Sequence, residues 1–521
     1  MAATNQIIDF FLSFFGIFFS NNILLIAKEN YLILENLLQD FILQLSYNPK
    51  APLLFNSGFF LIFFLIFVLI NTPLQTNKIL RNSWIVIASI YFYYKSSGYF
   101  FILMLATTIF VFALALSMGR IESKTSRKFL SAFGIVVLLL LLSYYKYFNF
   151  IIESVNSIFE FGITTHNIFL PLGISFYTFE LISYLADVYT KKAEPEKNLL
   201  DFCFYVSFFP HLVAGPIVRP NELFPQIKNL HIPSKLEIGS GVFLLISGIV
   251  KKAIISDYIS LNFVDRIFDN PTLYSGVENL LGVYGYTLQI YCDFSGYTDM
   301  ALGIALLIGF KLPNNFNVPY ISTSITEFWR RWHISLSSWL RDYLYIPLGG
   351  NRKGKFRQYL NLFLTMLLGG LWHGASWKFM FWGALHGLAL AIEKLLEPIT
   401  RNYPSTVFKI LGGIFTFHFV AFCWIFFRAS SFEVAWSLIN QIFINFSGYL
   451  FFEIVTSYKL VFIFVALGYT IHFIPKKIDI KIENIISKMP LLIQAILVVL
   501  VLFVFIQVKS SAIQPFIYFQ F

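Results

Sequence analysis

The chain consists of long apolar segments separated by short polar ones. A run of about 20 apolar residues is the length that an α-helix needs to cross a hydrocarbon core about 30 Å thick. The pattern predicts membrane-embedded helices at residues 7–27, 53–71, 83–95, 98–118, 129–148, 167–189, 200–218, 237–257, 277–291, 296–311, 359–371, 375–393, 407–427, 448–470 and 490–507. We therefore expect an all-α polytopic membrane protein.

Two polar, proline-containing stretches interrupt this pattern, at 208–220 and 312–350. Such segments fit re-entrant or broken helices, which a membrane tolerates only where protein or a water-filled cavity satisfies the exposed backbone. Polar residues concentrate between about 208 and 393, and we see no internal repeat of the kind that many transporters carry. We predict one membrane domain over residues 53–521, with its motif core at 200–393.

The N-terminal stretch is considered apart from this domain. Residues 1–52 are apolar at their start but lack a cationic n-region and a clear cleavage site. A removed signal peptide normally has both. We expect a retained membrane-embedded or interfacial segment.

Composition supports the membrane interpretation and narrows the possible partners. Hydrophobic residues make up 57% of the 521 residues and charged residues 13%, against about 25% charged residues in soluble domains. The net charge of +10 comes from short clusters of Lys and Arg between apolar runs, as in cytoplasmic loops of membrane proteins. Anionic lipid or an anionic donor is a better partner than nucleic acid, because the chain has no soluble basic domain.

Charged residues gather inside the predicted membrane region. Each charge costs about 2.5–3.5 kcal/mol at a membrane centre on insertion scales, so a cluster indicates a polar interior or a functional site. The simplest structural interpretation is that acids pair with bases, namely Asp293, Asp299 and Glu327 with Arg330, Arg331 and Arg341.

Aromatic and amide residues surround this charge cluster. Trp329, Trp332 and Trp339 flank the arginines, and Trp in that position is typical of an interfacial aromatic belt. Asn315, with neighbouring Asn and Pro residues, indicates a loop.

Two histidines stand in a context suited to chemistry. His333 follows Trp332, and His373 lies between Trp372 and Gly374. The alternative for His373 is core packing or a helix-end hydrogen bond, and for His211, beside two prolines, it is structural lining of a cavity. No metal site is predicted, because the three Cys lack metal-ligand spacing and His386 is 13 residues after His373.

Acyl transfer to a hydroxyl would use this set of residues. The attacking hydroxyl must lose its proton, and His, with an ordinary pKa near 6.5, suits that task at neutral pH. Donors such as Asn, a second His or backbone N–H groups could stabilise the developing oxyanion. The sequence has no Gly-x-Ser-x-Gly elbow, so it gives no support for a serine nucleophile of that type. It has no phosphate-binding glycine loop either, so nothing in it indicates an ATPase.

Four motifs carry a resemblance to a known family. They begin at Asp293 (DFSGYTDMALG), Glu327 (EFWRRWHISLS), Arg341 (RDYLYIPLGGNR) and Gly370 (GLWHG). The chain resembles the bacterial membrane-bound O-acyltransferases, in particular their alginate O-acetylase branch. The specific matches cover residues 200–390, and the motifs are long.

The resemblance implies a fold and a set of functional residues. It implies a ring of tilted, partly re-entrant helices around a central funnel, with His373 as the catalytic residue and His333 as the second polar position. We assign substrate binding to further residues of the same motifs, namely Asn315, Trp329, Arg330, Arg331 and Trp372.

The resemblance also implies the reaction. A thioester such as acetyl-CoA would supply the acyl group without any bound cofactor, and an extracytoplasmic hydrolase-like protein would help to deliver it to a polysaccharide outside the inner membrane of a bacterium. An alginate-like polymer is favoured, with peptidoglycan or teichoic acid as alternatives. A transporter or flippase of a lipid-linked sugar remains the alternative class, because it too would place charged residues and His within the membrane.

Two further expectations concern surfaces and the chain end. Positive-inside topology predicts that Arg330 and Arg331 face the cytoplasm together with Arg352, Lys353, Lys355 and Arg357, where some of them could attract an anionic donor. The simplest interpretation of the aromatic tail at 514–521 is an interfacial anchor. It also resembles a C-terminal motif of this family, which implies that Tyr518 is a transient acetyl carrier.

Overall fold

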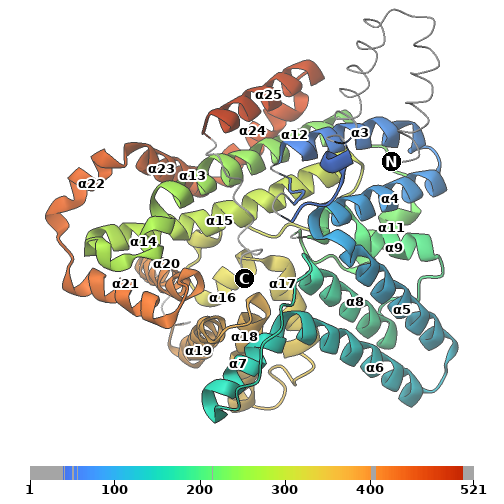
Figure 1. The fold of residues 1–521 in the computed structure, drawn as a ribbon, viewed down its shortest axis with the longest axis horizontal. Coiled ribbons are helices and arrows are strands. Elements are labelled where there is room, and N and C mark those ends of the chain that lie inside the picture. Colours follow the sequence, from blue (N-terminus) through green and yellow to red (C-terminus); the bar gives the residue numbers. More distant parts are fainter. Residues whose placement is uncertain are drawn as a thin grey trace, which may run out of the picture.

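The structure is a computed structural model of the chain, and it confirms the all-α fold class. It describes residues 39, 42–49, 52–55, 57–213, 215–400 and 406–508. Within these residues every regular element is a helix. Figure 1 shows long helices placed around two short ones, α16 (Ile325–Arg331) and α17 (Ile334–Leu340), which lie near the middle of the view. The predicted helix at 7–27 and the tail at 514–521 lie outside the described residues.

The longer helices are given in chain order. They are α3 (Gly58–Leu74), α4 (Lys78–Ser97), α5 (Phe101–Arg120), α6 (Lys124–Leu142), α7 (Phe148–Phe159), α8 (Ile174–Tyr189), α9 (Leu199–Ser207), α11 (Pro220–Lys228), α12 (Lys235–Ile249), α15 (Gly276–Leu307), α18 (Lys355–His373), α19 (Trp377–Thr400), α20 (Thr406–Arg428), α21 (Phe432–Ile444), α23 (Lys459–Phe473), α24 (Lys476–Lys488) and α25 (Leu491–Val508). Shorter pieces are α10 (Phe209–Leu212), α13 (Asp257–Ile259), α14 (Asp265–Asp269) and α22 (Phe451–Ser457).

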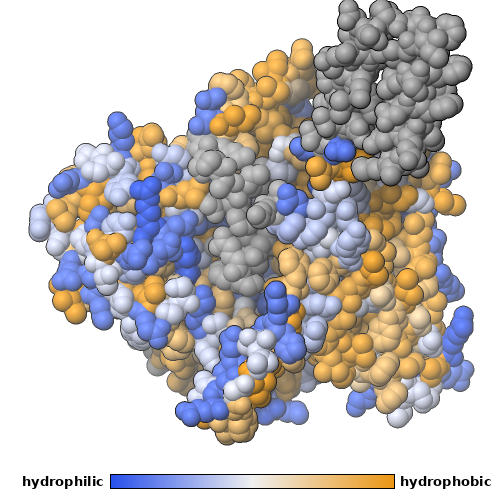
Figure 2. All heavy atoms as spheres, in the orientation of Figure 1, coloured by the Kyte–Doolittle hydropathy of each residue, from blue (hydrophilic) through white to orange (hydrophobic). Residues whose placement is uncertain are grey.

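Membrane-spanning length is reached by five helical runs within the described residues, or seven if each of two bent helix pairs counts as one span. The five runs are Lys78–Arg120, Lys124–Phe159, Lys235–Asp269, Trp377–Pro398 and Thr406–Arg428. Large apolar side chains of α5 and α6 are exposed, and Figure 2 shows them as a continuous apolar face. An apolar face of that extent suits lipid. The chain is therefore a multi-pass membrane protein.

Three predicted spans differ from the structure. Residues 277–291 and 296–311 were expected as two helices, but they form the single helix α15, because its central carboxylates are paired with lysines and require no break. The predicted span 448–470 is divided between α22 and α23 at Tyr458. The polar segment that becomes α24 was not predicted as a helix, and it bends by 97° from α23.

The two stretches expected to be broken are broken. Around 208–220, α9 ends and is followed by the four-residue helix α10 and then by α11. Within 312–350, α16 and α17 are seven residues each and meet at His333. These interruptions leave non-helical backbone among the packed helices, where protein groups must satisfy it.

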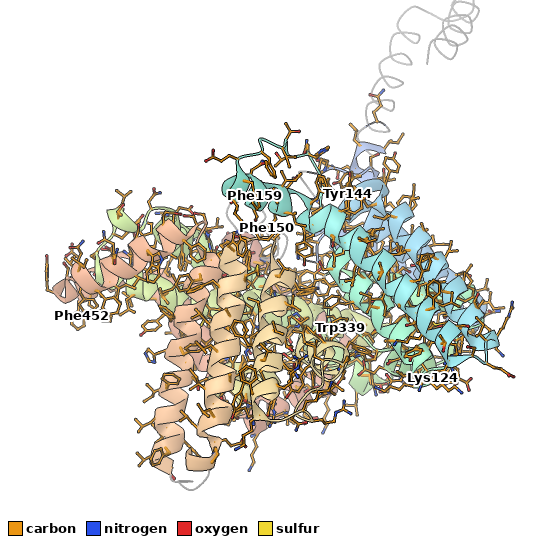
Figure 3. The ribbon with its side chains drawn as sticks, turned by 90° about the horizontal axis from the view of Figure 1, so that it is seen from below. Lys124, Tyr144, Phe150, Phe159, Trp339 and Phe452 are labelled. Carbon is orange, nitrogen blue, oxygen red and sulfur yellow. The ribbon has the colours of Figure 1, made fainter. Side chains whose placement is uncertain are left out.

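Helices α6 and α8 run in opposite directions, which defines two ends of the molecule. At the start of α6, Arg127 Nη2 donates to the carbonyls of Val188 and Tyr189, at the end of α8. Beyond the end of α6, Lys146 lies 3.4 Å from the hydroxyl of Ser175, at the start of α8. Figure 3 labels Lys124 and Tyr144 near these opposite ends.

The basic clusters at 120–128 and 191–197 lie at the Arg127 end, next to the end of α8. The hydroxyl of Tyr343 donates to Asp187, on the last turns of α8, at 2.8 Å. The segment that runs from Tyr343 to the basic cluster at 352–357 therefore begins at the Arg127 end as well. Three basic clusters therefore gather toward one end of the molecule.

Close packing of α12 against α15 depends on glycine. A Cβ placed on Gly248 would lie 2.5 Å from the carbonyl oxygen of Gly296, and one on Gly303 would lie 2.7 Å from that of Gly241. Small residues let membrane helices approach until their backbones touch, which supplies the packing energy that lipid cannot. This contact fixes the position of the part of α15 that contains Asp293 and Phe294.

We predict that Gly248→Ala destabilises the protein, because the added methyl group meets backbone that cannot move aside. Overpacking of this kind costs about 1–3 kcal/mol. Thermal unfolding of the detergent-purified protein should show a lower Tm. Gly58→Ala is the matched control, since a Cβ there meets nothing within 4 Å. An equal Tm for the two variants would contradict the proposed packing.

Candidate active site

His333 lies at the junction of two short helices, fully buried. It is the residue before α17 and has a left-handed backbone, with φ 43° and ψ 55°. Such a conformation is costly for a residue with a side chain, and it is retained where the surroundings hold it. The Nδ1 atom of His333 lies 3.1 Å from Oδ1 of Asn315.

Asn315 determines which nitrogen of His333 carries the proton. Its Oδ1 accepts hydrogen bonds from the backbone N–H of Ser335 at 3.1 Å and from the Ser335 hydroxyl at 2.9 Å. The backbone donor identifies this atom as the amide oxygen, so Nδ1 of His333 must donate to it. The remaining nitrogen, Nε2, is then the basic one.

The broken segment after α10 is tied to this same network. The backbone N–H of Ile217 donates to the Ser335 hydroxyl at 3.1 Å. The next residue, Val218, donates to Oε1 of Glu180, and Nδ1 of His211 lies 3.1 Å from that same oxygen. His211 thus lies beside a buried carboxylate, and its role in lining a cavity stays a prediction. The bond from Ile217 to Ser335 ties this loop to the network around Asn315.

His373 is the last residue of α18 and is 3% exposed. Its ring centroid lies 6.3 Å from that of His333 and 5.1 Å from those of both Trp372 and Trp382. Gly374 follows because the ring of Phe379 lies where a Cβ would be, 2.2 Å away. The two histidines predicted from separate motifs are therefore neighbours in space.

Aromatic side chains surround this histidine pair. Phe294 packs edge-on against His333 at 4.7 Å, and Phe427 against His373 at 5.5 Å. An apolar wall of this kind excludes water and strengthens electrostatic interactions within the site. His373 also lines a pocket of about 80 Å³, together with Lys146 and the segment 170–176.

The tryptophans are not the interfacial belt that their position beside Arg suggested. Trp329, Trp332 and Trp339 are 8%, 0% and 6% exposed, and Trp339 stacks on Phe179 at 3.7 Å inside the protein. The expectation was wrong because the three indole rings pack into the protein, although Arg330 and Arg341 beside them are exposed. Figure 3 labels Trp339 among the packed helices.

The predicted substrate-binding residues differ in burial and in their distance from the two histidines. Trp372 is 4% exposed and contacts both histidines, and Trp329 donates from Nε1 to Nδ1 of His386 at 3.3 Å. Arg330 is exposed, and Arg331 is partly exposed. Asn315 directs its oxygen to His333, while its buried Nδ2 has no hydrogen-bond partner among the described residues. Their roles toward substrate stay predictions, and Tyr518 lies outside the described residues.

Most of the expected acid–base partners are wrong. Glu327 does pair with Arg331, at 2.9 Å. Asp299 instead pairs with Lys251 at 2.7 Å, and Asp293 with Lys252. Arg341 pairs with its neighbour Asp342 at 2.7 Å. The lysines follow α12, the helix packed on α15, and tertiary contact rather than nearness in sequence selected the partner.

Sequence reasoning missed two residues near the site. His386 is fully buried and lies 4.8 Å from Trp382, the residue that also contacts His373. Its spacing of 13 residues from His373 argues against a metal pair and gives no sign that the two side chains share a neighbour. Lys146 reaches the carbonyl oxygens of Trp372 and His373. A lone lysine in an apolar run was the signal that could have found it.

A multi-pass membrane protein with a buried histidine pair at the ends of broken helices is suited to general-base group transfer. Residues 87–436 match the membrane-bound O-acyltransferase family, and the chain belongs to that family. It is therefore an O-acyltransferase, and the alternative class of transporter is not supported.

Named relatives show the range of this family. The chain is 45% identical over 401 residues to a probable alginate O-acetylase of Pseudomonas aeruginosa, covering 75% of each chain. It is 37% identical over 413 residues to a peptidoglycan O-acetyltransferase of Helicobacter pylori, covering 74% of this chain and 78% of the relative. A teichoic acid D-alanyltransferase of Bacillus subtilis is 32% identical over 287 residues, which cover 51% of this chain and 71% of the relative.

We predict that Asn315→Leu lowers the rate of acyl transfer about tenfold, because a buried donor left without its acceptor costs about 1–3 kcal/mol and His333 will reorient. The rate should be measured on protein of unchanged Tm.

Asn361→Leu is the matched control for this variant. Asn361 is also fully buried, but its amide donates to the carbonyl of Gly350, three turns of α18 before His373. Equal losses of rate in the two variants would show that Asn315 has no special relation to His333.

Proposed function

We propose that the chain moves acetyl groups from a cytoplasmic thioester donor toward hydroxyl groups of an extracytoplasmic polysaccharide, in the inner membrane of a bacterium. The observation that carries this proposal is the buried pair of His333 and His373, with ring centroids 6.3 Å apart. The probable alginate O-acetylases among the relatives favour an alginate-like acceptor. The peptidoglycan and teichoic acid relatives supply the alternative acceptors.

In this proposal His373 removes the proton from the attacking hydroxyl as the new ester bond forms. The oxygen attacks the thioester carbonyl, the thiolate leaves, and the proton passes from the imidazole to the departing sulfur. His333 assists with the second hydroxyl, the one that takes the acetyl group in the following transfer. Donation from Nδ1 of His333 to Asn315 leaves its Nε2 as a proton acceptor, so this nitrogen cannot donate to the oxyanion. Buried donors such as Nδ2 of Asn315 are suited to the oxyanion.

The donor is proposed to approach from the end of the molecule that carries the basic clusters. Positive-inside topology places that end in the cytoplasm. Arg330 and Arg331 with Arg352, Lys353, Lys355 and Arg357 supply positive charge for an anionic donor such as acetyl-CoA. Support for this step comes from the gathering of these clusters near the end of α8.

Delivery to the polymer is proposed to use the C-terminal tail and a partner. The Tyr518 hydroxyl would accept the acetyl group first, with His373 taking its proton. A phenolate is a better leaving group than an alkoxide, so the hydroxyl of a serine in an extracytoplasmic hydrolase-like protein could then attack the acetyl-tyrosine ester, take the acetyl group and release the Tyr518 hydroxyl. This step rests on the sequence motif alone.

We predict that His373→Ala lowers acetyl transfer about 10²–10⁴-fold, the usual contribution of a general base. Membranes that contain the protein would be supplied with acetyl-CoA labelled in the acetyl group, and label in polysaccharide or protein would be counted. His418→Ala, at an exposed histidine, is the control and should keep full activity. Near wild-type transfer by His373→Ala would refute the assignment.

We further predict that Tyr518→Phe abolishes labelling of the C-terminal peptide and acetylation of the polymer, because it removes only the hydroxyl. Mass spectrometry of the C-terminal peptide after exposure to the donor is the direct measurement. Tyr449→Phe removes the hydroxyl of an exposed tyrosine elsewhere in the chain and should have no effect. If Tyr518→Phe acetylates the polymer fully, the tail is an anchor and no relay.

A further inference from the structure

Lys146 is a charged residue that the acyl-transfer chemistry does not use. It lies in the π-helical turn at 143–147 that extends α6, within one of the apolar runs long enough to cross a membrane. Its ammonium group donates to the carbonyl oxygen of Trp372 and, at 3.3 Å, to that of His373. A lysine inside a membrane is costly and usually serves a function.

The contacts of Lys146 satisfy the end of α18. The last carbonyl groups of a helix have no partner within the helix. Tyr147 donates from its hydroxyl to the carbonyl of Leu371 at 3.1 Å, and Lys146 takes the next two carbonyls, of Trp372 and His373. Two successive residues of one turn therefore hold three successive carbonyls. A cation at a helix C-terminus also interacts favourably with the helix dipole.

The form of α6 at this point suits the contact. A π-helical turn inserts an extra residue into a helix and redirects the side chains around it, and such turns are frequent at functional sites. Here the turn directs Lys146 and Tyr147 together at α18, which is more than 220 residues later in the chain.

We propose that Lys146 is a positioning residue for acyl transfer. By holding the last turn of α18, it fixes the imidazole of His373 at its distance from His333. The inference rests on the proposed role of His373. Misplacement of a reacting group by about 1 Å can cost about 10²-fold in rate, so loosening of this helix end should lower kcat.

A pocket makes this contact accessible to experiment. Lys146, Ser175 and His373 line the same pocket of about 80 Å³. A pocket of that size holds several water molecules, so small reagents can reach its walls. Loss of the ammonium group would leave the carbonyls of α18 facing water.

The test replaces the ammonium group and then restores it. Lys146→Cys is made in a Cys203→Ser background, because the other two cysteines, Cys292 and Cys423, are buried. Alkylation with 2-bromoethylamine rebuilds a side chain of the length and charge of lysine, whereas iodoethane rebuilds its bulk without the charge. We expect kcat to fall about 10²-fold in the cysteine variant with KM for acetyl-CoA nearly unchanged, to recover with 2-bromoethylamine, and to stay low with iodoethane.

Arg81→Met provides the matched control. Arg81 is a buried cation of α4 that donates to the carbonyls of Ile227 and Asn229 at the end of α11, which carries neither of the two site histidines. It should show a similar loss of Tm but keep kcat. Tyr147→Phe is a milder variant that removes only the bond to Leu371, and it should lower kcat without changing KM. That variant keeps the inference testable if Lys146→Cys does not fold.

A second measurement needs no acyl donor. The rate at which diethyl pyrocarbonate modifies His373, followed by mass spectrometry, should rise in Lys146→Cys and return after 2-bromoethylamine. An unchanged modification rate, an unchanged kcat, or equal rescue by iodoethane would overturn the role of Lys146. Absence of transfer by the wild-type protein would instead count against acetyl-CoA as donor, and the modification rates would still decide the role of Lys146.

Discussion

Backbone groups that a broken helix leaves inside a membrane need partners from the protein, because lipid offers none. Both site histidines lie at such places. His373 ends α18, whose last carbonyls are held by Lys146 and Tyr147, and His333 lies between α16 and α17. The groups that satisfy this backbone are thus the groups that orient the imidazoles. Asn315 shows this most directly, since its oxygen accepts from the backbone of Ser335 and from the ring of His333.

A rigid frame of long helices surrounds these interruptions. α12 and α15 touch through glycine backbones, and the lysines that follow α12 neutralise the carboxylates of α15. The pairing lets α15 continue as one helix of 32 residues through the polar motif. Phe294 of α15 packs against the ring of His333. The packing of α12 on α15 therefore affects the position of His333 through this ring contact.

The aromatic motifs serve the interior and not the membrane surface. Trp332 and Trp382 are fully buried, and Trp382 contacts both His373 and His386. A wall of large rings around two imidazoles excludes water, which would compete for an acyl group, and leaves polar contacts few and strong. The pocket beside Lys146 lies toward the end of the molecule opposite the basic clusters.

The sequence alone determined the membrane class and the two broken stretches, because a bilayer restricts backbone so strongly that apolar length and misplaced polar residues carry most of the information. It also singled out His333 and His373, which the structure brings together and whose catalytic roles stay predictions. It could not determine which charges pair, that α15 is continuous, that the tryptophans are buried or that Lys146 holds α18. These depend on contacts between residues far apart in the chain, such as Lys146 and His373, 227 positions apart. Local pattern shows that a buried charge needs a partner, but only the packing of helices decides which partner lies within reach.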